Sequence, residues 1–317
     1  MNKFIRKQPL TFFVSAILGI TTVIIGTSVK AQIDPNPEQI STPKFTNAEN
    51  ADKFKLPADG KPFKPNGLNQ LNKLPKTRVI IGTDDRIPMT SRKYPWSAIG
   101  RVAGISASGG EYHCTGTLIA ENLVLTNSHC VIDPNTNKLS HKIWFQPNVI
   151  NREVLDIADV ATVKEVIYGT DFTGQNQDKN DWAVMLIDRP LGRKYGYLGL
   201  KNLPTSAFVW MRQQLFFVGY SGDFPDPRKP AYRRFTAGPG WTAGVQQGCS
   251  IVGEEEETLL HDCDTTAGAS GGPIIAIIDN NPYIVALHNA GEQSSEGKGI
   301  VNFAVKISSI QEALKGN

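Results

Sequence analysis

The stretch Asp264-Thr265-Thr266-Ala267-Gly268-Ala269-Ser270-Gly271-Gly272-Pro273 places one serine among three glycines, directly before the apolar run Ile274-Ile275-Ala276-Ile277-Ile278. This pattern predicts a tight turn that leads into a buried strand. Glycine at 268 and 271 allows backbone N–H groups to approach a reacting carbonyl closely, which a larger side chain would obstruct. A glycine-rich serine turn is weak evidence by itself, so its meaning depends on the residues upstream.

Length and charge set the first bounds. The chain has 317 residues and a formal net charge of +3, with 33 Lys and Arg against 30 Asp and Glu. This length allows two domains, or one domain plus processed segments. The basic residues are scattered rather than clustered, which argues against a nucleic-acid-binding surface.

The amino terminus has the pattern of an export signal. A basic region over 3–7 precedes the largely apolar stretch 10–27, and Val29-Lys30-Ala31 has the small-residue spacing of a signal peptidase site. We therefore expect a signal peptide over 1–31 and a secreted or periplasmic protein that is free of the membrane after cleavage. The alternative is a retained anchor, because the apolar run nearly reaches the roughly 18 residues that a span needs.

The composition changes sharply over 32–77. This stretch contains seven prolines and seven lysines, with few β-branched or aromatic residues. Such a segment cannot bury enough apolar surface to offset the entropy cost of ordering it, so we expect a disordered linker or pro-segment over 32–78. Cleavage after Arg78 would release a mature chain that begins at Val79. The alternative is that Arg78-Val79-Ile80-Ile81-Gly82 simply begins a strand and is never cut.

Short apolar runs bounded by Gly, Pro, Asn or Asp fill the rest of the chain. Many short strands separated by turn signals predict a sandwich or barrel rather than βαβ units. The predicted strands cover 96–105, 112–119, 123–126, 142–145, 160–168, 182–187, 215–220, 273–278, 283–288 and 299–305. Glycines and prolines over 189–205 indicate a connection between two halves. Only the C-terminus predicts a helix, with Ile307, Ile310 and Leu314 on one face.

Three polar islands place reactive side chains beside these apolar runs. In the first, His129 follows a predicted strand and adjoins Cys130, which can bridge to Cys114 on a neighbouring strand. In the second, Asp181 leads directly into the apolar run that begins at Trp182. The third is the Ser270 turn.

Together the three islands resemble the trypsin/chymotrypsin-like serine endopeptidases in the chain order His, Asp, Ser and in local sequence. The resemblance covers about 78–314. It implies an all-β fold of two six-stranded antiparallel β-barrels with a short C-terminal helix. The protease domain would then cover 79–317, with the first barrel at about 92–190, the second at about 205–305 and the helix at 306–315.

The resemblance assigns a role to each member of the set. A serine hydroxyl is a poor nucleophile until a base removes its proton, and an imidazole with a near-neutral pKa suits that task. Ser270 would be the nucleophile, His129 the general base and then acid, and Asp181 the carboxylate that orients the imidazole. Backbone N–H groups of Gly268 and Ser270 would form the oxyanion hole.

The other acids and histidines lack this context. Asp178 and Asp188 flank Asp181 in polar surroundings, and we expect both to be solvated. The remaining candidates are histidines without a partner motif, and we expect them at the surface or at strand ends. They are His113, His141 and His261.

The four cysteines allow two interpretations. His113-Cys114, His129-Cys130 and His261 with Cys263 could imitate a zinc set. No closely spaced Cys-x-x-Cys pair occurs, however, and an exported chain favours disulfides. Of three possible connectivities we expect the local one, Cys114–Cys130 and Cys249–Cys263. We expect no metal and no cofactor.

The serine turn also satisfies the G-x-S-x-G elbow of the α/β-hydrolases. That fold alternates helices with strands and places its acid and histidine after the serine. Here the helical patterns are missing, and only His288 follows Ser270. An esterase is therefore disfavoured.

Within the family, the resemblance is closest to the bacterial glutamyl endopeptidases. It rests on the stretch 79–86, on Asp264-Thr265-Thr266 and on Leu287-His288. In that group the threonine five residues before the serine and the late histidine receive a glutamate carboxylate, which implies this role for Thr265 and His288. A hydroxyl and an imidazole can bind a carboxylate through charge-assisted hydrogen bonds. The alternative for His288 is an ordinary residue at a strand end.

Asp264 supports a competing specificity. It lies six residues before Ser270, where trypsin-like enzymes place the acid that binds lysine or arginine. If its carboxylate points into the pocket, the same enzyme would prefer Lys or Arg. If it turns outward or pairs with His288, the preference for Glu remains, and this is the preference we expect.

Residue 269 departs from the trypsin pattern. Those zymogens mature when the new N-terminus pairs with an aspartate directly before the nucleophile, but this chain has Ala269 there. A pro-segment that silences the enzyme must therefore act by occlusion or through an N-terminus used differently. We expect a monomer acting on protein or peptide substrates. The alternative from another functional class is a catalytically silent protein-binding module on the same fold.

Overall fold

The structure is a computed structural model that describes residues 33–50, 60–70, 84–174, 178–293, 295 and 299–314. The signal peptide expected over 1–31 and the cleavage expected after Arg78 lie outside these residues. Within the described ranges, no helix has both the length and the apolar character needed to span a bilayer.

The first sheet closes into a six-stranded antiparallel barrel. Its strands run in the order β9-β10-β5-β4-β3-β8, and β8 pairs with β9 to complete the ring. The strands are β3 (Ile99–Ile105), β4 (Glu111–Leu118), β5 (Leu123–Thr126), β8 (Lys142–Pro147), β9 (Ala161–Tyr168) and β10 (Ala183–Ile187). Apolar side chains such as Val102, Leu125 and Val184 fill the interior and are fully buried. Burial of this apolar face explains why these runs form strands.

The second sheet has nine strands, and its main path runs β14-β15-β18-β17-β16-β12-β13-β2, with β11 beside β17. Its strands are β2 (Ile87–Pro88), β11 (Gly199–Leu200), β12 (Leu215–Gly219), β13 (Gly244–Cys249), β14 (Ile251–Glu255), β15 (Thr258–His261), β16 (Pro273–Ile278), β17 (Asn281–Gln293) and β18 (Gly299–Lys306). The expected second closed barrel differs here, because no pairing joins β13 to β14 among the described residues. Only Ser250 separates β13 from β14 in the chain, so continuous backbone links these two strands, which lie near opposite ends of the strand order.

Helices are few and short. The expected C-terminal helix is confirmed as α3 (Ile307–Leu314), in which Ile307 and Ile310 are buried. Two further helices, α1 (Gly192–Tyr195) and α2 (Ala207–Trp210), were not expected. Four residues are only about one helical turn, which is too short for a helical repeat to show in the sequence. Strands β6 (Ile132–Asp133) and β7 (Lys138–Leu139) form a separate two-stranded ribbon.

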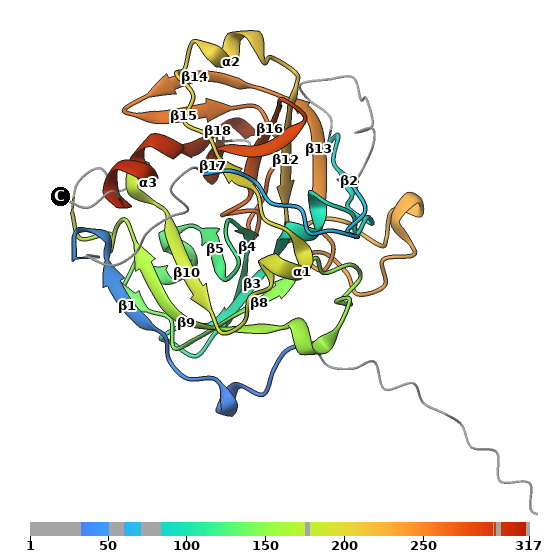
Figure 1. The fold of residues 1–317 in the computed structure, drawn as a ribbon, viewed down its shortest axis with the longest axis vertical. Helices are drawn as coiled ribbons and strands as arrows, with labels where there is room; N and C mark the ends of the chain where they lie inside the picture. The colour runs from blue at the N-terminus through green and yellow to red at the C-terminus, as the bar shows by residue number, and fades with distance from the viewer. Residues whose placement is uncertain are drawn as a thin grey trace, which may run out of the picture. The chain divides into compact units, whose positions relative to one another are not determined.

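The segment expected to be disordered differs from that expectation where the structure describes it. Strand β1 (Lys44–Asn47) pairs in parallel with β9, and Figure 1 shows it in blue along the edge of the first barrel. Ile33 and Ile40 are buried. The composition of this segment did not predict the burial of its few apolar residues, because the surface that buries them comes from strands distant in sequence.

Candidate active site

The ends of two paired strands bring His129 and Asp181 together. Strand β5 ends at Thr126, which lies opposite Ala183 at the start of β10. The residues that follow β5 and those that precede β10 therefore meet at one edge of the barrel. Asn127 Nδ2 donates to the Asp181 carbonyl at 2.6 Å, and Ser128 Oγ donates to the Trp182 carbonyl at 2.7 Å. These two bonds fix the register in which His129 faces Asp181.

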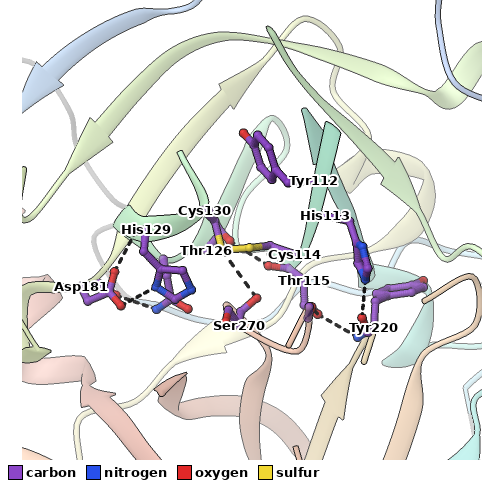
Figure 2. Close-up of a disulfide and its surroundings, with 12 residues drawn as sticks. Tyr112, His113, Cys114, Thr115, Thr126, His129, Cys130, Asp181, Tyr220 and Ser270 are labelled. Atoms are coloured by element: carbon purple, nitrogen blue, oxygen red, sulfur yellow. Dashed lines mark hydrogen bonds and ion pairs between the residues drawn. A yellow bond between two sulfur atoms is a disulfide. The ribbon is translucent and has the colours of Figure 1, made fainter. Parts of the chain in front are cut away.

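The Asp181 carboxylate receives two hydrogen bonds from His129. Nδ1 lies 2.7 Å from Oδ2, and the backbone N–H donates to Oδ1 at 3.0 Å (Figure 2). Since the ionised carboxylate only accepts, Nδ1 carries the proton and Nε2 is left as an acceptor. Burial disfavours the charged imidazole, but the Asp181 carboxylate outweighs burial and raises the pKa of His129 above its ordinary value.

Ser270 is attached to the same barrel through its backbone. Its carbonyl accepts from the Thr115 N–H at 2.8 Å and lies 3.9 Å from Cys130 Sγ. Cys130 follows His129 and forms a disulfide with Cys114, so the serine turn lies against the histidine segment (Figure 2). Within the described structure, Ser270 Oγ makes no hydrogen bond to His129 Nε2.

Glycine is required in the serine turn by close contacts. Gly268 has φ +93°, and a Cβ there would lie 2.4 Å from His113 Nε2 and 2.6 Å from the Tyr220 carbonyl. Thr115 Oγ1 holds the Gly268 carbonyl at 3.0 Å. The backbone N–H groups of Gly268 and Ser270 donate to no acceptor in the described part of the chain. Two free donors beside a serine are what an oxyanion hole requires.

His113 supports this turn, although the sequence indicated only a surface or strand-end residue. Its Nε2 lies 2.9 Å from the Tyr220 carbonyl, which can only accept, so Nε2 carries the proton. Burial, with a smaller contribution from Arg101, lowers the pKa of His113 to about 4. The neutral ring fits between Gly240 and Gly268. No local sequence signal marks this role, because the two glycines come from other segments of the chain.

Two further histidines, His261 and His288, lie together in the core of the second sheet. His261 Nδ1 accepts from the Cys263 N–H at 3.2 Å, so its proton is on Nε2, which lies 3.1 Å from His288 Nδ1. His288 must then carry its own proton on Nε2. Burial lowers the pKa of His261 to about 3 and that of His288 well below its ordinary value, so both rings are neutral. His261 ends strand β15, as one of its two expected positions had it, but its side chain is fully buried rather than at the surface.

Thr265 and Asp264 have partners that bear on their expected roles. Thr265 Oγ1 donates to Asn302 Oδ1 at 3.0 Å, while Asn302 Nδ2 donates to the Cys263 carbonyl at 2.8 Å. The Asp264 carboxylate accepts from the Asp85 N–H at 2.9 Å, and the described structure shows no hydrogen bond between this carboxylate and His288. Burial raises the pKa of Asp264. Asp264 is therefore engaged with the segment that begins at residue 84.

That segment is anchored by Arg86, a residue the sequence did not single out for a role. Its side chain is 6% exposed, and its guanidinium forms paired hydrogen bonds to both Asp84 and Asp223. Asp223 also accepts from Thr266 Oγ1 at 2.5 Å, which links the network to the loop before Ser270. Bidentate contacts of this kind hold both partners in a defined orientation.

Both expected disulfides are confirmed. Cys114 pairs with Cys130, and Cys249 pairs with Cys263. His129 lies near the first pair and Asp262 near the second. Because all four sulfurs are in disulfides, they cannot act as the thiolate ligands that a zinc site would need.

Comparisons with known proteins place the chain in a family. A family model described as Trypsin matches residues 87–314. The CLIP domain-containing serine protease B4 of Anopheles gambiae is 20% identical over 258 residues, which is 76% of this chain and 70% of that protein. A solved Glu endopeptidase in complex with MPD is 25% identical with a TM-score of 0.56, covering 75% of this chain and all of that one. The protease Anisep from Arthrobacter nicotinovorans is 18% identical with a TM-score of 0.53, covering 70% and 95%. The chain belongs to the trypsin family of serine proteases.

Proposed function

We propose that this protein is an active serine endopeptidase with Ser270 as nucleophile, His129 as general base and then acid, and Asp181 as the orienting carboxylate. The observation that carries the proposal is the 2.7 Å contact between His129 Nδ1 and Asp181 Oδ2. This bond leaves Nε2 free to accept a proton on the side where the Ser270 turn lies.

The reaction follows from these positions. Ser270 Oγ attacks the scissile carbonyl carbon as its proton moves to His129 Nε2. The resulting oxyanion accepts from the N–H groups of Gly268 and Ser270, each worth about 3 kcal/mol to the transition state. The C–N bond then breaks as His129 protonates the leaving amine, which leaves an acyl-enzyme. A water, deprotonated by His129, hydrolyses that ester and restores Ser270.

The missing bond between Ser270 and His129 is compatible with this mechanism. Catalytic hydrogen bonds in substrate-free enzymes are often long, and they tighten in the complex with substrate. We expect Ser270 Oγ to reach Nε2 when a peptide occupies the site.

For substrate preference, we favour Glu before the scissile bond. His288 is neutral and carries its proton on Nε2, which gives it the one N–H donor that carboxylate recognition requires; its ring hydrogen-bonds the Phe303 backbone and would exchange that partner for the substrate. The Thr265 hydroxyl would exchange Asn302 for the substrate carboxylate. The Asp264 carboxylate already accepts a hydrogen bond from the Asp85 N–H, which weakens the alternative preference for Lys or Arg. A relative solved as a Glu endopeptidase adds support.

Two measurements test this function. A fluorophosphonate should label the purified protein at Ser270, and Ser270→Ala should abolish the labelling; an unlabelled, folded wild type would identify the silent binding module instead. A peptide panel that varies only the residue before the scissile bond should then show fastest cleavage after Glu. Fast cleavage after Lys or Arg, with none after Glu, would refute the pocket assignment and leave the enzyme intact.

We also propose that the enzyme is exported and acts as a monomer. The two disulfides support export, because such bonds persist in oxidising compartments. Mass spectrometry of protein recovered separately from culture medium and periplasm should find a chain that lacks residues 1–31. Protein that keeps those residues in the membrane fraction would indicate the retained anchor.

A further inference from the structure

Residues 33–70 lie upstream of the expected cut at Arg78 and outside the matched family region, which begins at residue 87. A removable pro-segment would be expected to contact the catalytic residues that it silences. The contacts of this segment point instead to a structural role.

Strand β1 completes an edge of the first barrel. On one side of β9, strand β8 pairs only with Ala161 and Thr162. Strand β1 pairs in parallel with the later part of β9, from Lys44 opposite Glu165 to Asn47 opposite Tyr168. Lys44 Nζ also lies 3.1 Å from a Glu165 carboxylate oxygen. Without β1, this part of β9 would be an open edge with unpaired backbone groups.

The same segment buries apolar side chains. Ile33 is 4% exposed and Ile40 is 2% exposed. Ile40 packs in a small cluster with Trp144 and Val160, and its carbonyl accepts a hydrogen bond from Lys142 Nζ. Release of the segment would expose both the isoleucines and the surface that receives them.

Asp34 supplies negative charge beside two arginines, the buried Arg101 and the more exposed Arg152. Its carboxylate accepts from Gln146 Nε2 at 2.9 Å and lies 3.5 Å from Arg152 Nη2. Gln146 Oε1 in turn accepts from Arg101 Nη1 at 3.0 Å. Arg101 is 8% exposed, and burial lowers its pKa to about 10 against the opposing effect of Asp34. Loss of the segment would leave this buried guanidinium without its principal counter-charge.

Residues 60–70 form a second attachment. Phe63 and Tyr197 exchange two backbone hydrogen bonds, at 3.0 and 2.9 Å, and their rings stack with centroids 5.2 Å apart. The Gly60 carbonyl accepts from the Leu200 N–H at 2.8 Å, and the Asn69 carbonyl accepts from the Tyr94 N–H at 2.9 Å. The segment therefore binds at two separate places.

None of these contacts includes His129, Asp181, Ser270, Thr265 or His288. We propose that residues 33–50 and 60–70 are a permanent structural part of the enzyme, which stays bound after the expected cut at Arg78. The surface around β9, Trp144 and Tyr197 is thus covered by the chain's own upstream segment. This segment is retained rather than released on maturation. The proposal does not depend on catalytic activity.

A split gene tests retention. Chains 32–78 and 79–317 are exported together, with an affinity tag on the second chain only, and Ser270→Ala in that chain prevents self-digestion. We expect the two chains to copurify in equal amounts through size exclusion and to melt at the temperature of the unsplit protein. Recovery of 79–317 alone, folded and melting at that same temperature, would overturn the proposal.

Substitutions test the individual contacts in both formats. Ile40→Asp and Asp34→Asn should each lower the melting temperature of the unsplit Ser270→Ala protein, Ile40→Asp by about 5 °C or more. In the split protein, Ile40→Asp should reduce the copurified amount of 32–78 at least tenfold. Glu38→Gln is the matched control, since this side chain is exposed in the same segment. Melting temperatures that match the control for both variants would refute a structural role.

Discussion

Replacing Asp181 with asparagine should disable His129 while preserving its surroundings. The two carboxylate oxygens each accept one hydrogen bond, Oδ1 from the His129 backbone N–H at 3.0 Å and Oδ2 from Nδ1 at 2.7 Å. An asparagine has one oxygen for these two donors. If the oxygen keeps the backbone contact, the NH₂ group faces Nδ1, which must then accept, so the proton moves to Nε2. A protonated Nε2 cannot take the proton of Ser270.

We expect a large loss of kcat because His129 could no longer accept a proton on Nε2, although its position would be unchanged. A wrong tautomer in a catalytic triad costs about 10⁴-fold in kcat, or roughly 5 kcal/mol of transition-state stabilisation. Initial rates on a fluorogenic peptide measure kcat, and the rate of fluorophosphonate labelling gives a second readout that does not depend on the peptide chosen.

Asp178→Asn is the matched control for this experiment. Its side chain is exposed three residues away, so both readouts should stay unchanged. An Asp181→Asn enzyme that keeps kcat within about tenfold of the wild type, with its fold intact by circular dichroism, would refute the assignment of His129 and Asp181 as a catalytic pair.

Three further outcomes follow from the site. Because the base must be neutral and Asp181 raises the pKa of His129, kcat/KM should rise with pH through an apparent pKa above 6.5; an inflection below 6.5 would contradict this. Gly268→Ala would place a Cβ 2.4 Å from His113 Nε2 and should lower kcat by about 10²-fold or more, whereas Gly110→Ala, with its nearest contact at 3.5 Å, should not. His288→Phe should lower kcat/KM for Glu peptides by about 10- to 150-fold through loss of a charge-assisted hydrogen bond, and an unchanged ratio of Glu to Gln cleavage would exclude His288 from the pocket.

Patterns of short range were predictable from the sequence. The short strands, the C-terminal helix and the local pairing of Cys114 with Cys130 and of Cys249 with Cys263 all depend on residues near one another in the chain. The need for glycine at 268 was also predicted, from the close backbone approach expected at the serine turn, and the structure adds a positive φ that other residues rarely adopt.

Roles that depend on distant partners were not predictable. His113 and His261 looked unremarkable, yet one supports the serine turn and the other sets the tautomer of His288. The link from Arg86 to the serine loop gave no signal either, since Asp223, its second aspartate partner, lies far along the chain. Each role is created by a neighbour that the linear sequence does not identify.

The sequence by itself determined the family resemblance, the disulfides and the identity of the three candidate catalytic side chains, because each is encoded by local residue types and spacing. Only the tertiary structure decided where protons and charges lie: on Nδ1 of His129, on Nε2 of His288, and between Asp34 and a buried Arg101. It also decided that β1 pairs with the first barrel and that residues 60–70 bind Tyr94, Tyr197 and Leu200. Hydrogen bonding, burial and charge compensation arise between segments that folding brings into contact, and their energies therefore cannot be read from one segment alone.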